Sequence, residues 1–167
     1  NVLAHVPDLN DFVRGLETLL APEGVLTMEF PHLLNTIEGN HFDTIYQEHY
    51  CYLSLYAVSQ VFEFHGLTLF DVEEVPTHGG SLRIFARHSG ESGRAVLPSV
   101  TELLAREVER GLTDLATYAA FGERVAETKR KLLEFLIGAR REGKRIVGYG
   151  APGKGNTLLN YCGIRTD

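Results

Sequence analysis

Five consecutive residues, Tyr46-Gln47-Glu48-His49-Tyr50, place a phenol, a carboxylate, an imidazole and a second phenol next to one another. A histidine beside a carboxylate can act as a general base near neutral pH, and a tyrosine hydroxyl can donate to a developing oxyanion. The surrounding stretch 42–54 shows neither strand alternation nor an apolar helical stripe. It therefore predicts a loop with acid–base chemistry, and a polar surface loop with aromatic anchors is the alternative.

The elements before this loop predict a βαβ unit. Residues 2–6 suit the end of a buried strand, and Asp8 suits the N-cap of a helix over 8–20. Residues 25–30 suit a central strand that ends at Pro31. Strand, helix and strand at this spacing imply parallel strands joined by a right-handed crossover.

In a parallel sheet, ligands bind beyond the carboxyl ends of the strands. His5 ends the first expected strand, and Glu29 and His32 end the second. The loop around His49 follows at once. We therefore expect several segments to bring acid–base side chains to one rim: His5, His32, Tyr46, Glu48 and His49.

The elements after the loop predict an antiparallel hairpin. Ser54 suits the N-cap of a helix that ends at Gly66, and a strand is expected over 67–72. Residues 81–87 alternate between apolar and other side chains and follow a short turn at 77–80. A parallel sheet closed by an antiparallel hairpin is how the S-adenosylmethionine-dependent methyltransferase fold ends. The predicted fold class is therefore α/β, with the second half of a Rossmann-like sheet.

Three domains are expected along the chain. Residues 1–94 would form the C-terminal half of the domain that contains the sheet. Residues 95–143 would form a helical connector, with helices over roughly 100–110 and 114–141. Residues 144–167 would begin a second α/β domain. Because the chain starts without a methionine and stops just after that expected βα unit, we expect it to be part of a longer protein.

A glycine-rich stretch opens the last of these domains. Gly148, Gly150 and Gly153 fit the Gly-x-Gly-x-x-Gly pattern after an expected strand at 145–149, which is typical of dinucleotide binding. Pro152 is unusual inside such a loop, and the expected acidic ribose ligand would fall at or beyond the end of the chain. A turn that faces a phosphate-bearing substrate and a purely structural turn are the alternatives.

Composition limits the function. A net charge of −6 and a pI near 5.6 argue against nucleic-acid binding. The sequence contains no signal-peptide pattern and no apolar stretch long enough to span a membrane. Cys51 and Cys162 are isolated, so they offer no zinc site and indicate a reducing compartment, with a cytoplasmic location expected.

Four separate stretches, 1–9, 42–54, 75–83 and 148–155, resemble segments of the sugar C-methyltransferases. These enzymes methylate a ring carbon of nucleotide-linked 4-keto-deoxysugars. The resemblance implies an N-terminal zinc-binding domain, a methyltransferase domain and a C-terminal α/β domain. It also implies S-adenosylmethionine as cofactor, bound mainly by a loop outside this chain, with any zinc likewise outside it.

The resemblance also implies roles for individual residues. His49 would be the general base, Tyr46 and Glu48 would orient the sugar, stabilise the enolate or tune His49, and His5 would line the same pocket. The partners would be a nucleotide-diphosphate sugar and the rest of the polypeptide. Residues expected to contact this substrate are His78, Ser81, Arg83, Gly150 and Lys154.

Two other functions remain open at this stage. The first is a nicotinamide-dependent oxidoreductase that uses the loop Gly148–Gly153. The second is a nucleotide-sugar-binding module without catalysis, against which the presence of Tyr46, Glu48 and His49 argues mildly.

Overall fold

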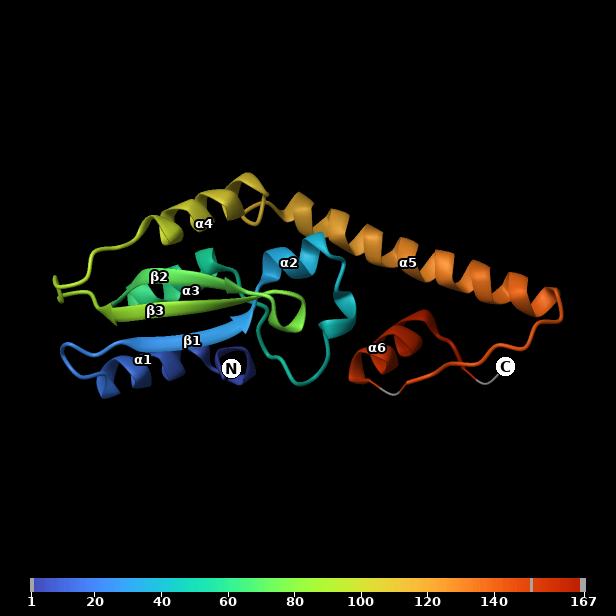
Figure 1. Ribbon diagram of the computed structural model, residues 1–167, viewed down its shortest axis with the longest axis horizontal. Coiled ribbons are helices and arrows are strands. Elements are labelled where there is room, and N and C mark those ends of the chain that lie inside the picture. Colours follow the sequence, from blue (N-terminus) through green and yellow to red (C-terminus); the bar gives the residue numbers. More distant parts are fainter. Residues whose placement is uncertain (1, 151, 166–167) are drawn as a thin grey trace.

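The computed structural model describes residues 2–150 and 152–165 (Figure 1). Asn1, Ala151, Thr166 and Asp167 lie outside the described residues. The expectations for the stretches 1–9, 148–155 and 144–167 lie outside them at these four positions. The structure contains helices, short 3-10 helices and a small sheet, in the order η1 (Leu3–His5), α1 (Leu9–Leu19), β1 (Leu26–Pro31), α2 (Leu33–Glu38), η2 (Phe42–Thr44), α3 (Leu55–Phe64), β2 (Leu67–Val75), η3 (Thr77–Gly79), β3 (Ser81–His88), α4 (Pro98–Glu109), α5 (Leu115–Arg141) and α6 (Gly153–Cys162).

The sheet has three strands in the order β1-β3-β2, and β3 is antiparallel to both neighbours. The predicted hairpin of β2 and β3 is therefore confirmed. The expected parallel pairing of residues 2–6 with residues 25–30 is wrong for the described residues, because Leu3–His5 is a 3-10 helix and β1 pairs with β3. Pairing partners come from distant residues, which a local hydrophobic pattern does not specify.

Residues 2–6 do not form the strand that was expected there. Leu3–His5 is a 3-10 helix, in which the His5 backbone N–H donates to the carbonyl of Val2. The carbonyl of Ala4 accepts from the backbone N–H groups of Tyr50 and Cys51 at 2.8 and 3.2 Å. These backbone bonds tie η1 to the loop instead of to a strand, and so they fix His5 beside that loop.

Helices cover the sheet and form one main core with it. In Figure 1, α1 lies beyond β1 and α4 lies beyond β2. Along β3, alternate side chains are fully buried, and α1, α3 and α4 contribute apolar side chains to the same cluster. The buried members on β3 are Leu82, Ile84 and Ala86. Burial of large apolar side chains such as Leu82 and Ile84 contributes about 1.5–3 kcal/mol each. This burial stabilises the packing of the sheet against the helices.

Local capping signals are confirmed at two helix starts. The Asp8 carboxylate accepts from the backbone N–H of Asp11 at 2.9 Å, and the Ser54 hydroxyl accepts from that of Ala57 at 3.0 Å. Each cap satisfies a backbone donor that has no partner within its helix. Because α3 begins directly after Ser54, this cap also sets where the functional loop ends.

The C-terminal segment contradicts one expectation. Residues 144–150 form no strand, and the side chains of Val147 and Tyr149 are fully or largely exposed. A strand needs a partner for its backbone N–H and C=O groups, and the described residues place none beside this segment. The following helix α6 does form, and it packs on η2, with the Phe42 and Tyr161 rings 5.3 Å apart.

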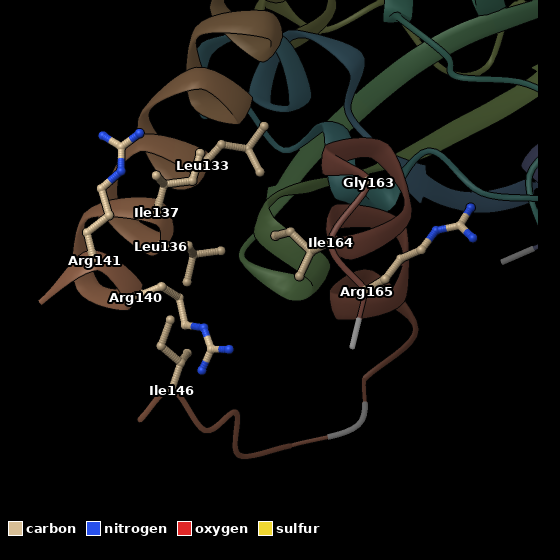
Figure 2. Close-up of a pocket in the computed structure, with 9 residues that line it drawn as sticks. All are labelled: Leu133, Leu136, Ile137, Arg140, Arg141, Ile146, Gly163, Ile164 and Arg165. Atoms are coloured by element: carbon tan, nitrogen blue, oxygen red, sulfur yellow. The ribbon is translucent and has the colours of Figure 1, made fainter. Parts of the chain in front are cut away.

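A hollow of about 620 Å³ separates α5 from the C-terminal segment (Figure 2). Leu133, Leu136 and Ile137 of α5 face it, and Ile146 and Ile164 close it. Arginines lie along its edge, but its lining contains no histidine, carboxylate or tyrosine. Its side chains therefore offer no acid–base chemistry.

Among the described residues, no helix combines the length and apolar character that a bilayer-spanning segment requires.

Candidate active site

A cavity of about 310 Å³ lies at the end of the sheet where β1 and β2 finish and β3 begins. Pro31 at the end of β1 pairs with Ser81 at the start of β3, and both line the cavity. The loop between η2 and α3 forms a second wall. The complete lining is His5, Pro31, Thr36, Thr44, Tyr46, Glu48, His49, Tyr52, His78, Ser81 and Lys154.

Hydrogen bonds within the loop determine where its side chains point. The backbone N–H of His49 donates to the carbonyl of Tyr46 at 3.2 Å, which closes a tight turn. The backbone N–H of Tyr46 donates to the hydroxyl of Tyr52 at 3.1 Å. Together with the bonds from Tyr50 and Cys51 to Ala4, these contacts hold Tyr46 and His49 on the cavity side.

His5 is fixed in one tautomer. Its Nδ1 lies 2.8 Å from the carbonyl oxygen of Glu48, and because a carbonyl can only accept, Nδ1 carries the proton. The centroids of the His5 and His49 rings are 4.8 Å apart. At this separation the His5 ring lowers the pKa of His49.

His49 has the environment of a neutral base. Burial lowers the pKa of His49 below its ordinary value of 6.5, and the neighbouring His5 and His78 lower it further. Glu48 and the carbonyl of Thr44 raise the pKa of His49, each by less than burial or His5 lowers it. The neutral ring keeps a lone pair on one of its two nitrogens at neutral pH.

Tyr46 and Glu48 form a donor and acceptor pair beside this base. The pKa of Tyr46 is raised by burial, and next by a hydrogen bond to the Glu48 carboxylate and by its charge. Tyr46 therefore keeps its proton well above neutral pH and can donate it in a hydrogen bond. The Tyr46 and His49 rings are 5.7 Å apart, so a small reactant can contact both.

The remaining predicted substrate contacts divide into two groups. His78, Ser81 and Lys154 line the cavity, and the Ser81 hydroxyl donates to the carbonyl of Thr77 at 3.2 Å. Lys154 stands in the first turn of α6, so its ammonium group and the helix start favour an anion together. Their roles stay predictions.

Arg83 and Gly150 lie outside the cavity lining. Arg83 pairs with Glu29 at 3.1 Å and Glu73 at 3.3 Å across the strands, and Gly150 is exposed in the irregular segment before α6. Glu29, expected at the rim, is engaged by Arg83 and also by the Thr77 hydroxyl at 3.1 Å. His32, also expected there, is completely buried beneath the cavity.

Sequence reasoning did not single out four lining residues, Pro31, Thr36, Thr44 and Tyr52. Tyr52 and Thr44 belong to the aromatic stretch that drew attention, but only the fold shows that they face the cavity. Thr36 carries no signal in the sequence, because α2 itself was not expected.

The fit of S-adenosylmethionine to these residues is poor. The cavity lining contains no glycine-rich turn and pairs its carboxylate, Glu48, with Tyr46 rather than leaving it free for a ribose. No group of histidine, cysteine and carboxylate side chains suited to a metal ion occurs within residues 2–150 and 152–165. The cavity therefore provides acid–base groups, and its lining does not fit this cofactor.

Comparison with known proteins gives the family. Residues 76–167 match the model of the C-methyltransferase C-terminal domain. The chain is also similar to C-methyltransferase NovU of Streptomyces niveus, with 39% identity over 161 residues. That match covers 96% of this chain but 38% of the length of NovU. The chain belongs to the C-methyltransferase C-terminal domain family.

Proposed function

We propose that this chain carries the acid–base groups of a C-methyltransferase that acts on a nucleotide-linked 4-keto-deoxysugar. The observation that carries the proposal is the convergence of His5, Tyr46 and His49 on one cavity, with the pKa of His49 lowered. Methylation of a carbon beside a ketone requires removal of a proton from that carbon. A neutral histidine next to a tyrosine hydroxyl suits this requirement.

In the proposed reaction, the free ring nitrogen of His49 takes the proton from the ring carbon next to the ketone. The two electrons of that C–H bond form the enolate, whose negative charge gathers on the former ketone oxygen. When the sugar binds, the single O–H of Tyr46 turns from the Glu48 carboxylate to this oxygen and donates a hydrogen bond to it. S-adenosylmethionine, bound elsewhere in the protein, would supply the methyl group.

The other lining residues would bind the nucleotide sugar. Lys154 at the start of α6 suits a diphosphate oxygen, because both the ammonium group and the helix start attract an anion. His78 and Ser81, which also line the cavity, suit sugar hydroxyls. With the diphosphate bound by the Lys154 ammonium group, the attached sugar ring would be held toward His49.

The oxidoreductase alternative finds less support. The dinucleotide pattern requires a strand directly before the first glycine, and Gly148 lies in irregular backbone within the described residues. A fluorescence titration of the full-length protein with NADH separates the two functions. Tight, saturable binding of NADH would favour the oxidoreductase.

The direct test is a methylation assay of the full-length protein that contains this chain. Thymidine- and uridine-linked 4-keto-6-deoxyhexoses are incubated with S-adenosylmethionine, and the product is analysed by mass spectrometry and NMR. We expect a product with one new methyl group on a ring carbon adjacent to the ketone. A methyl group on oxygen or nitrogen, or none with any of these sugars, would contradict the proposal.

A further inference from the structure

A fully buried pair of ionisable side chains lies beneath the cavity and takes no part in the proposed chemistry. His32 Nε2 is 2.7 Å from Oε1 of Glu107, and both side chains have 0% exposure. His32 follows directly after β1, and Glu107 lies in the last turn of α4, 75 residues further along the chain. A buried carboxylate costs free energy unless it is fully hydrogen-bonded, so its other contacts matter.

Glu107 caps the start of α3 from a distance. Its Oε1 accepts the backbone N–H of Leu55, and its Oε2 accepts that of Tyr56, each at 2.7 Å. Ser54 satisfies the next backbone N–H, that of Ala57. The backbone N–H groups of residues 55–57 at the start of α3 are thus paired, and the Glu107 carboxylate accepts N–H groups from the backbone and from His32 together.

The protonation of His32 follows from the same contacts. Because ionised Glu107 can only accept, the His32 Nε2 carries a proton. The Nδ1 atom of His32 is buried and has no hydrogen-bond partner. The link from His32 to α4 therefore runs through Nε2 alone among its ring atoms.

The backbone of His32 joins the walls of the cavity. Its N–H donates to the carbonyl of Gly80 at 3.0 Å, next to Ser81. Its carbonyl accepts from the backbone N–H of Thr36 at 3.1 Å and from the Thr36 hydroxyl at 3.3 Å. The adjacent Leu33 N–H donates to the carbonyl of Leu53, next to Tyr52. Ser81, Thr36 and Tyr52 each line the cavity.

We propose that His32 and Glu107 are positioning residues that hold the cavity walls at 31–36, 52–54 and 78–81 in register with α3 and α4. Neither side chain contacts the substrate. Loss of the pair would let the walls shift relative to one another, and with them Tyr52 and the loop that carries His49. The kinetic part of this inference rests on the proposed function, whereas the structural part does not.

The test compares variants of the full-length protein. Glu107→Gln replaces one carboxylate oxygen by an NH₂ group, which must face a donor of His32, Leu55 or Tyr56. Glu109→Gln is the matched control, because it makes the same change two residues later on the exposed side of α4. His32→Leu removes the donor, and His32→Gln keeps an N–H that can reach Glu107.

The first measurement is independent of activity. In protein labelled with ¹⁵N-histidine, we expect the ring resonances of His5 and His49 to shift in Glu107→Gln and His32→Leu, and to return toward wild type in His32→Gln. Glu109→Gln should leave them unchanged. Unmoved resonances in a folded Glu107→Gln or His32→Leu protein would overturn the inference. If Glu107→Gln and His32→Leu both fail to fold, the test rests on His32→Gln. If its His5 and His49 resonances are displaced from wild type as far as those of a denatured sample, the inference is overturned as well, because the retained donor then restores nothing.

The second measurement is the methylation rate. A misplaced wall of a reactive cavity can cost up to about a hundredfold in rate. We expect kcat to fall roughly ten- to hundredfold in Glu107→Gln and His32→Leu and less in His32→Gln, with the control within about twofold. Shifted resonances with unchanged kcat would support the positioning of the walls and contradict the proposed use of this cavity in catalysis.

Discussion

Residues 42–52 and residues 144–150 both carry sequence patterns typical of a ligand site, but their surroundings differ. The first stretch is bonded to η1 through Ala4 and internally through the Tyr52 hydroxyl, and it faces a cavity. The second is exposed, with irregular backbone among the described residues. Among the described residues from 144 onward, Lys154 on α6 is the one that lines that cavity.

This difference shows what a motif requires from its surroundings. The side chains of Tyr46 and His49 are placed by hydrogen bonds within the loop and by the bonds from Tyr50 and Cys51 to Ala4. A glycine-rich turn works only when a strand and a helix aim its backbone N–H groups at one point. A motif of side chains is therefore supported here by a few hydrogen bonds within the loop and to η1, whereas a motif of backbone conformation depends on its sheet.

The largest effect that we expect concerns the loop. Tyr46→Phe removes the hydroxyl that would stabilise the enolate oxygen and keeps the ring. We expect kcat to fall by roughly a hundredfold, the size typical for loss of an oxyanion donor. Steady-state kinetics of the full-length protein measure it. Tyr118→Phe is the matched control, because its hydroxyl donates to the carbonyl of Leu112 and neither residue lines the cavity, and a comparable loss there would undermine the assignment.

A smaller effect is expected from the residue that links the second region to the cavity. Lys154→Met removes the charge and keeps much of the side-chain length. A charged hydrogen bond contributes about 1.5–3 kcal/mol, and partial exposure of Lys154 reduces this, so KM for the nucleotide sugar should rise about tenfold with kcat little changed. If kcat falls and KM stays constant, Lys154 acts on the reaction and not on binding.

The smallest effects concern pH. Because the base must be neutral and the pKa of His49 is lowered, kcat/KM should stay high at pH 6.5 and fall only under more acidic conditions. His5→Asn removes a neighbouring positive charge, so the pKa of His49 and the acidic limb should move to higher pH. Glu48→Gln removes a negative charge and should move both to lower pH. Shifts in the same direction for both variants, in pH profiles of kcat/KM, would exclude His49 as the titrating group.

The helices could be predicted from sequence because their signals are local. The expected helix over 8–20 is α1, the expected helix over 55–65 is α3, and the expected 114–141 is α5, each within about two residues at its ends. Caps such as Ser54 act within one turn, so they need no information from the rest of the chain.

The strand order could not be predicted in the same way. Which strand lies between β1 and β2 depends on pairing between residues such as Phe30 and Leu82, which are far apart in sequence. The burial of His32 depends likewise on Glu107 in a distant helix. Tyr46, Glu48 and His49 were therefore predictable from the sequence of their own loop, whereas the burial of His32 against Glu107 was not.

The most direct test of the account is proton exchange without methyl transfer. The full-length protein is incubated with a nucleotide-linked 4-keto-6-deoxyhexose in D₂O and no methyl donor, and NMR follows the ring proton beside the ketone. We expect wild type and His65→Asn, a change outside the cavity lining, to exchange this proton for deuterium, and His49→Asn to be slower by about a hundredfold or more. Exchange by His49→Asn at the wild-type rate would contradict the assignment of His49 as the base.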